Sequence, residues 1–380
     1  SGYGPFAPLS ALETVYVPAG VYSEYSAAYK TYLPSGARMR SIGAEGDFQI
    51  DDGVLTVYLG DGGEVEIPDG VEEIGTSAFQ NCSGLTKVTV PASVKKIGEY
   101  AFNGCDDLTE VVFAEGLETI GTNAFYGCGS LAGLEFPDTL ASIGDAAFSQ
   151  CTGLADISFG KGLKTVGGNA FNGCSGLEAL ELPEGLESIG YSAFYQCTGM
   201  AGGLVIPASV QVIGDRAFYG CTGLDGKLVI EGGEKSVGNY AFRDCSGLTG
   251  LELGEGIRSI GDSAFYQCTG LTGELELPEG LESIGNSAFY QCAGLTGGLE
   301  LPESLTSLGS SAFYGCSGFT GELVVPDQVT VLPYGVFGRM EGITSIIIGT
   351  GVTTINKSSV SSHPFYGISG VTEVTFTGLT

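Results

Sequence analysis

Residues 85–107 read LTKVTVPASVKKIGEYAFNGCDD, and versions of this stretch follow one another along most of the chain. Every complete copy contains the pattern Ala-Phe-x-x-Cys, which accounts for all 11 cysteines, and consecutive cysteines are 23 or 24 residues apart. A fixed period of this length is typical of a solenoid, in which each repeat stacks on its neighbour. The cysteines are Cys82, Cys105, Cys128, Cys151, Cys174, Cys197, Cys221, Cys245, Cys268, Cys292 and Cys316.

Each repeat predicts one strand followed by tight turns. Val88 and Val90 lie two residues apart, so Thr89 between them points to the opposite face of a strand. Pro91 lacks a backbone N–H and ends the strand. The segment around Phe102 reads Ser-Ala-Phe-Tyr-Gln-Cys in later copies and has no β-branched residue, so we expect a single helical or 3₁₀ turn there.

One repeat cannot bury its own apolar stripe, so stacked repeats must bury it against one another. The sequence therefore predicts a β-rich repeat solenoid, a right-handed array of about 13 rungs with parallel strands and the short helical or 3₁₀ turns on its convex side. A glycine precedes each turn segment, where the coil changes direction and where a positive φ suits glycine. These glycines are Gly75, Gly98, Gly121, Gly144, Gly167, Gly190, Gly214, Gly238, Gly261, Gly285 and Gly309.

The recurring motif L-x-x-V-x-I-P-x-x-V-x-x-I-G-x-x-A-F-x-x-C resembles the BspA-like, treponemal-type leucine-rich repeat. The resemblance covers about residues 64–380, and several positions of the motif recur in each unit. It implies a leucine-rich-repeat array in a bacterial cell-surface or secreted protein that is associated with adhesion to host matrix proteins or other cells. It offers no catalytic residues, because the family shares none.

The beginning of the chain departs from the repeat and suggests three segments. Residues 1–43 predict the end of a preceding repeat block with a short amphipathic helix, residues 44–63 a hairpin cap with Asp52-Gly53 as its turn, and residues 64–380 the array of 23–24-residue units. The residues at helical spacing are Val21, Tyr25, Ala28, Tyr29 and Tyr32.

Some units within the array also depart from the motif. From Met200 onward most units gain one residue before the strand, which predicts a bulge or a widened turn. Glu234 replaces an apolar residue, so we expect its rung to be loose. Val374 and Phe376 belong to a last strand with no cap. Either the array is cut short there, or two copies pair end to end through this strand. Without such pairing we expect a monomer.

The composition disfavours several classes of partner. The chain has 44 acidic and 15 basic residues and a formal charge of −29. Nucleic acid and acidic membrane surfaces are therefore disfavoured, because both are bound through Lys and Arg. No apolar run reaches the ~18 residues that a membrane span needs, so we expect no direct membrane insertion. The resemblance implies an extracellular or bacterial cell-surface location.

The cysteines and the histidine give no sign of chemistry. The cysteines are odd in number and share one phase of the repeat, which favours a column of buried, free thiols over disulfides or metal binding. The one histidine, His363, lies in a Ser-rich insertion, and no catalytic or phosphate-binding motif is present. We therefore predict no enzymatic activity, no cofactor and no metal site.

Two columns of outward residues are candidates for a binding surface. The first is acidic, and between residues 244 and 338 it is accompanied by a single basic residue, Arg258. Three interpretations stay open: a solubilising face, a docking strip for a basic partner, or a low-affinity Ca²⁺ site. The acidic candidates are Glu252, Glu274, Glu276, Glu300 and Glu322.

The second column is aromatic and follows the repeat phenylalanine directly. It predicts either packing of Tyr on Tyr or a stripe that binds a glycan or a protein. Its members are Tyr126, Tyr195, Tyr219, Tyr266, Tyr290 and Tyr314. Together with the resemblance, these columns favour a non-catalytic adhesive binding module with an unidentified protein or glycan ligand. The alternative is a structural spacer that displays another part of a larger surface protein.

Overall fold

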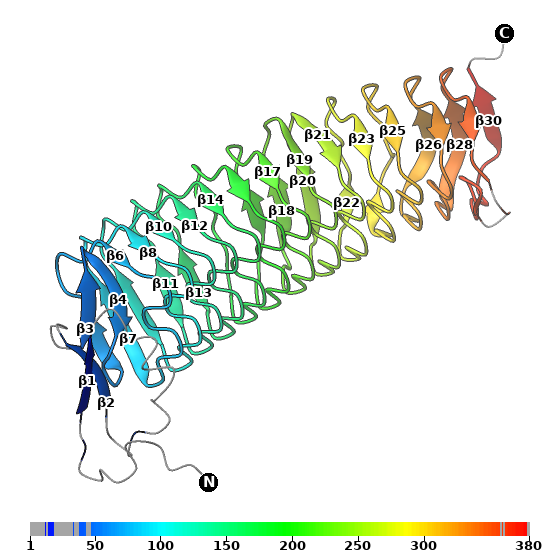
Figure 1. Cartoon of the computed structure of the whole chain (residues 1–380). Coiled ribbons are helices and arrows are strands. Elements are labelled where there is room, and N and C mark those ends of the chain that lie inside the picture. Colours follow the sequence, from blue (N-terminus) through cyan, green and yellow to red (C-terminus); the bar gives the residue numbers. More distant parts are fainter. Residues whose placement is uncertain are drawn as a thin grey trace.

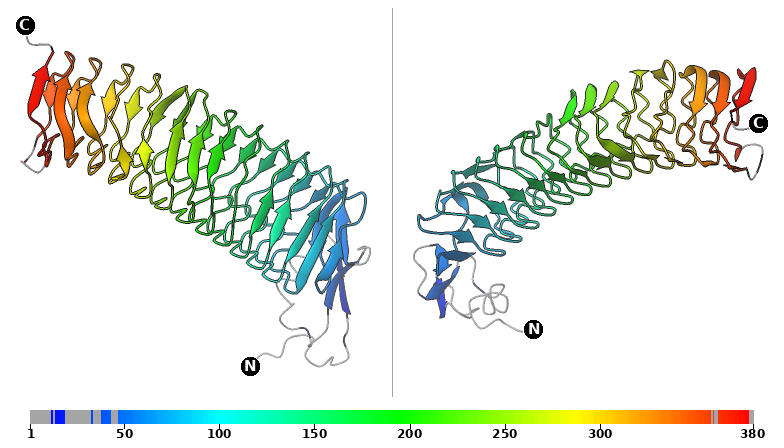
Figure 2. Two further views of the ribbon diagram at one scale, coloured as in Figure 1. Left: turned by 180° about the vertical axis from the view of Figure 1, so that it is seen from behind. Right: turned by 90° about the horizontal axis from the view of Figure 1, so that it is seen from above.

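The computed structural model describes residue 12, residues 14–18, residue 33, residues 38–42, residues 47–357, residue 359 and residues 362–377. In this part the chain winds into one elongated solenoid of parallel strands, which bends gently along its length (Figures 1 and 2). The helix expected between Val21 and Tyr32 lies outside the described residues.

Two strand pairs precede the regular coils. Strand β1 (Thr14–Pro18) pairs in parallel with β2 (Arg38–Ile42). Strands β3 (Phe48–Asp51) and β4 (Val54–Tyr58) form the antiparallel hairpin that the Asp52-Gly53 pair indicates. Both turn residues have positive φ, 48° at Asp52 and 78° at Gly53, as a two-residue hairpin turn requires. The division of the chain into three segments remains a prediction.

One side of the solenoid, the short-strand face, carries a continuous 13-stranded sheet that begins with β3 and β4 (Figure 1). Its strands are mostly two residues long and pair in parallel with those of the next rung. They are β6 (Glu73–Ile74), β8 (Lys96–Ile97), β10 (Thr119–Ile120), β12 (Ser142–Ile143), β14 (Thr165–Val166), β15 (Ser188–Ile189), β17 (Val212–Ile213), β19 (Lys235–Val237), β21 (Ile257–Ile260), β23 (Ser283–Ile284) and β25 (Ser307–Leu308), followed by the separate pair β27 (Val331–Leu332) and β29 (Thr354–Ile355).

A second side, the long-strand face, is formed by the strands that the Val-x-Val-Pro pattern predicts. Its parallel sheet is interrupted and divides into groups of five, three, two and three strands. The groups are β5 (Gly63–Glu66), β7 (Leu85–Val90), β9 (Glu110–Phe113), β11 (Gly133–Glu135) and β13 (Asp156–Ser158); β16 (Leu204–Ile206), β18 (Lys227–Ile230) and β20 (Gly250–Leu253); β22 (Gly273–Glu274) and β24 (Leu295–Thr296); β26 (Thr320–Val325), β28 (Gly342–Ile348) and β30 (Glu373–Phe376).

The third side consists of turns, and the predicted helical or 3₁₀ turn is not found in the described Ala-Phe-x-x-Cys segments. Ser192 and Gln196 have φ of 51° and 54°, and left-handed residues at this spacing break a helix. Alternate N–H groups donate to the next rung instead: Ser192 to the carbonyl of Asp215, and Phe194 to that of Ala217, both at 2.8 Å. The turns are therefore stacked on one another through hydrogen bonds, much as the strands are.

The core lies between these three sides and is a set of residue columns along the axis. The repeat phenylalanines from Phe79 to Phe365 stack with ring centroids 4.7–6.1 Å apart. All 11 cysteines are free, and all except the half-buried Cys82 are buried. From Cys105 onward each thiol donates to the carbonyl of a phenylalanine in the preceding rung, at 3.0–3.2 Å.

The glycine that precedes each turn is required for a different reason from the one expected. Its φ is not positive in the rungs, so conformational freedom does not select it. A Cβ on Gly98 would lie 2.8 Å from the carbonyl carbon of Gly75, and Gly121 and Gly144 approach the preceding rung as closely. Glycine is therefore needed because neighbouring rungs touch there, backbone to backbone.

The lengthened units behave as the sequence indicates, and the rung of Glu234 is irregular in another way than expected. Gly273, Gly297 and Gly321 in the lengthened units have positive φ, and the pairing of β26 with β28 shifts register at Gly321. In the irregular rung Glu234 points to solvent, and the pairing of β19 with β21 shifts register after Lys235. Lys235 itself takes the buried position, which the sequence analysis did not foresee.

Candidate binding face

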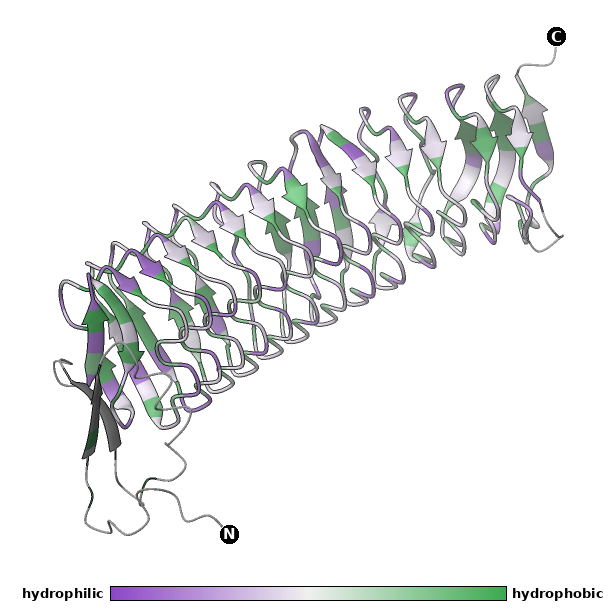
Figure 3. Ribbon diagram, in the orientation of Figure 1, coloured by the Kyte–Doolittle hydropathy of each residue, from purple (hydrophilic) through white to green (hydrophobic). Residues whose placement is uncertain are grey.

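The acidic candidates lie on the long-strand face, as expected, and all five are exposed. They fall into two neighbouring columns. Glu252, Glu276 and Glu300 each lie between two leucines that face the core, whereas Glu274 and Glu322 directly precede a buried leucine. Figure 3 shows the resulting alternation of hydrophilic and hydrophobic residues along the strands of the solenoid.

Only part of this acidic strip is neutralised. Glu252 forms an ion pair with Lys227 of the preceding rung. Glu322 accepts a hydrogen bond from the hydroxyl of Ser345 at 3.3 Å. Glu276 and Glu300 have no ion-pair partner among the residues that the structure describes, so their charges face solvent.

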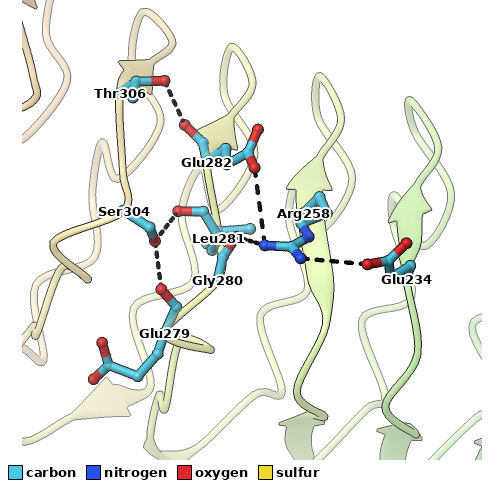
Figure 4. A network of polar contacts seen from close by, with 8 residues as sticks. All are labelled: Glu234, Arg258, Glu279, Gly280, Leu281, Glu282, Ser304 and Thr306. Carbon is cyan, nitrogen blue, oxygen red and sulfur yellow. Dashed lines mark hydrogen bonds and ion pairs between the residues drawn. The ribbon is translucent and has the colours of Figure 1, made fainter.

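The single basic residue between residues 244 and 338 is on the other face. Arg258 belongs to β21 of the short-strand face, where its guanidinium lies 3.5 Å from Glu234 and 3.9 Å from Glu282 (Figure 4). The same guanidinium donates to the carbonyl of Gly280 at 3.5 Å. Arg258 is therefore engaged away from the acidic strip and does not offset its charge.

The tyrosine candidates lie on the turn side and mostly stack on one another. Tyr195 stacks on Tyr219 at 5.0 Å, and Tyr290 lies between Tyr266 at 4.8 Å and Tyr314 at 5.2 Å. Burial is the main cause of a raised pKa at Tyr219 and at Tyr290.

An arginine joins the two tyrosine stacks. Arg243 occupies the tyrosine position of its own rung, and its guanidinium lies 5.7 Å from the ring centre of Tyr219 and 4.3 Å from that of Tyr266. The ring faces are thus covered by neighbours, which leaves edges and hydroxyls for a ligand. Tyr126 stands apart from these stacks and is 41% exposed.

The long-strand face has interruptions that the sequence analysis did not predict. No backbone hydrogen bond joins residues 179–182 to the rung on either side, although all of these rungs are within the described chain. The same holds for residues 275–277 and 299–301. All three stretches contain the Leu-Glu-Leu of a Leu-Glu-Leu-Pro-Glu copy. Leucine and glutamate favour strands less than valine or isoleucine does, and proline cannot donate to a ladder.

A groove with a volume of 1330 Å³ lies at the first of these interruptions, between residues 109 and 185. Val112, Ile157, Phe159 and Leu182 contribute apolar surface to it, and Val112 is 40% exposed. The groove opens where outward residues are small. Its acidic residues are Glu110, Glu135, Asp156, Glu181 and Glu184. The sequence does contain small outward residues here, Gly133, Ser158 and Ala179. They indicate a groove only when the register of the rungs is known, because the register places them on adjacent rungs.

The histidine of the C-terminal insertion, His363, contacts a residue close to it in sequence. His363 packs at 5.8 Å from the ring of Phe365, and its Nδ1 accepts the backbone N–H of that residue at 3.3 Å. Among the described residues no group of His, Cys, Asp and Glu side chains is arranged to hold a metal ion. Within the same part of the chain, no helix has the length and hydrophobicity to cross a membrane.

The stacked rungs match a known repeat family. The family model described as BspA type Leucine rich repeat region, with six copies, matches residues 72–201, 118–249, 201–319 and 273–378. The chain belongs to this family. A comparison with functionally curated proteins gives no match.

Solved structures of bacterial leucine-rich repeat proteins are also similar to this member of the family. A leucine rich cell surface protein from Faecalibacterium prausnitzii is 24% identical, with a TM-score of 0.50 over 88% of this chain and 94% of that one, which supports the fold. A leucine-rich repeat protein from Bacteroides ovatus is 29% identical, with a TM-score of 0.49 over 71% and 82%. The pneumococcal vaccine antigen PcpA is 21% identical, with a TM-score of 0.44 over 89% and 96%.

Proposed function

We infer that the chain is a non-catalytic binding module of a bacterial cell-surface or secreted protein, and that it adheres to host or microbial proteins or glycans. The acidic strip carries this inference: Glu252, Glu274, Glu276, Glu300 and Glu322 are exposed, while Arg258 is held on the other face. The negative electrostatic field of such a strip accelerates encounter with a cationic partner. Membership of the BspA-type repeat family and the cell-surface description of the Faecalibacterium protein support the location.

The experiment begins with a binding screen of the purified chain against matrix proteins, mucins and glycans. The variant that reverses Glu274, Glu276 and Glu300 to Lys is then compared with the wild type for each partner found. Because these side chains are exposed, the fold should be retained. Binding should weaken at low salt and differ less at high salt, since screening acts over ~8 Å at physiological ionic strength.

A control variant with the same change in net charge separates a local effect from a general one. Glu72, Glu99 and Glu118 are exposed and lie beside the short strands. Reversing these three to Lys should leave partner binding unchanged. If the strip variant binds as well as the wild type, the strip is a solubilising surface, and the tyrosine column becomes the next candidate.

A structural spacer is the second candidate function. The continuous sheet of the short-strand face and the unbroken phenylalanine stack favour a stiff rod. A screen in which the isolated chain binds no partner at all would favour this candidate over adhesion.

A further inference from the structure

We propose that the groove between residues 109 and 185 is a docking site for an extended peptide segment of a partner protein that carries lysine or arginine. The proposal rests on the binding function inferred above and places a specific site in the N-terminal half of the long-strand face. It is separate from the acidic strip, whose residues lie between 252 and 322.

The first argument is the charge around the groove. Five carboxylates and one lysine, Lys161, line it, which gives a net charge of −4. Only Glu110 among the carboxylates has an ion-pair partner in the described chain, Lys87 at 2.8 Å. Glu135, Asp156 and Glu181 are exposed and form no ion pair with any residue that the structure describes. A cationic segment would neutralise charges that the fold itself leaves uncompensated.

The second argument is the apolar surface of the groove. Ile157 and Phe159 occupy core positions of β13 and its end, yet both are only partly buried. The equivalent residues of β7, Val88 and Val90, are fully buried. The apolar side chains that are covered in the β7 rung are therefore partly exposed in the β13 rung. Side chains of a partner can contact them there, and burial of this apolar surface would add affinity that does not depend on charge.

The third argument is the backbone at residues 179–182. Its N–H and C=O groups have no hydrogen-bond partner on either neighbouring rung, and Ala179 and Glu181 are exposed. An extended peptide can bond to such groups through its own main chain, as in strand addition. The groove volume of 1330 Å³ exceeds the ~300–1,000 Å³ of a typical small-molecule pocket, which favours a peptide as the occupant.

The charge, the apolar surface and the unpaired backbone together suggest which residue types a peptide ligand should carry. An extended chain presents alternate side chains to opposite sides. Apolar residues at alternate positions would contact Val112 and Ile157, and lysines between them would reach the carboxylates of Glu135 and Glu181. The test peptide is therefore a fluorescein-labelled heptapeptide of alternating lysine and valine, and the negative control replaces its lysines with glutamate.

Fluorescence anisotropy measures the Kd of both peptides for the full chain at several salt concentrations. The lysine peptide should bind and weaken with salt, and the glutamate peptide should not bind. The double variant Glu135→Lys/Glu181→Lys should raise the Kd by about tenfold or more, since it removes two attractions and adds two repulsions. Ala179→Trp, which adds bulk without charge, should also raise the Kd.

Matched variants outside the groove give the decisive comparison. Glu72→Lys/Glu118→Lys makes the same charge change beside the short strands, and Gly298→Trp adds similar bulk where a Cβ meets no atom within 4 Å. Both should leave the Kd within about twofold of the wild-type value. Circular dichroism of every variant confirms that the fold is retained.

Each other outcome overturns the proposal. Equal weakening by groove and matched variants shows a general charge effect. Displacement of the peptide by a neutral oligosaccharide at the groove assigns the site to a glycan. If the wild type binds a partner from the screen but not the lysine peptide, the groove inference fails and the proposed function stands; if it binds neither, both fail.

Discussion

The phenylalanine column sets the stability of the solenoid, and Phe194→Ala tests this at its middle. Phe194 has no exposed surface, and its ring stacks on Phe171 at 5.3 Å and on Phe218 at 5.2 Å. Truncation of a buried phenylalanine costs ~3–5 kcal/mol through lost burial and the cavity left behind. Each of the two stacked pairs contributes ~0.5–1.5 kcal/mol beyond buried area, so we expect the upper part of that range.

The last rung of the column supplies the control. Phe365 is only partly buried and stacks on one phenylalanine, Phe337 at 6.0 Å. Phe365→Ala should therefore cost less than half as much as Phe194→Ala. Chemical denaturation gives the change in unfolding free energy, and hydrogen exchange followed by mass spectrometry locates the loss of protection.

In a repeat array the damage should be confined mainly to adjacent rungs, because each rung contacts only its neighbours. We therefore expect faster exchange around residues 171–218 and little change near β7 or β28. Equal costs for the two substitutions, or a uniform loss of protection along the whole chain, would refute the picture of a stack whose strength lies in nearest-neighbour contacts.

Two further predictions concern buried ionisable groups. Denaturation without reductant should release close to 11 titratable thiols. Burial raises the pKa of Cys174 and Cys292 from 9.0 to about 12. The stability that these two thiols contribute should be fully present below about pH 8.5 and should be lost as the pH rises toward 12, so the free energy of unfolding should fall less steeply over this interval in the double Cys→Ala variant. A column of disulfides would give few thiols. Lys235→Met should raise the free energy of unfolding, measured by chemical denaturation, by ~1 kcal/mol or more. The lysine is 3% exposed, and burial lowers its pKa. Its Nζ donates to the carbonyl of Pro207 at 3.0 Å, and this carbonyl keeps the N–H of Val210 as a donor after the substitution. A lower free energy of unfolding would show that the Lys235 hydrogen bond outweighs its burial cost.

The core could be predicted from the sequence because it depends on phase alone. Phe194 and Cys197 recur at a fixed distance in every unit, so a single period places both in columns. The same logic gave the exposed side of the strand, on which Glu276 and Glu300 lie. The hydrogen bonds from each thiol to a phenylalanine carbonyl did not follow, because they join different rungs at a spacing that no local pattern reveals.

The turns and glycines show where local rules fail. Ser192 and Gln196 adopt left-handed conformations although neither residue prefers them strongly. The N–H bonds to the next rung hold them there, so stacking overrides the helical preference that the segment suggests. Gly98 likewise looks like a residue chosen for its φ, whereas the contact that excludes a Cβ comes from the rung before it.

The groove escaped prediction for a related physical reason, and that reason bears on function. Gly133, Ser158 and Ala179 are unremarkable in sequence, and they make a hollow only because consecutive rungs stack them beside an unpaired backbone. The short-strand sheet and the phenylalanine column run uninterrupted past the same rungs. The scaffold therefore does not depend on a complete ladder on the long-strand face. Outward residues there can change in size and charge, and single rungs can open, without breaking the stack. Because the short-strand sheet and the phenylalanine column hold the rungs together, substitutions on the long-strand face can change which partner is bound with the smallest loss of folding stability.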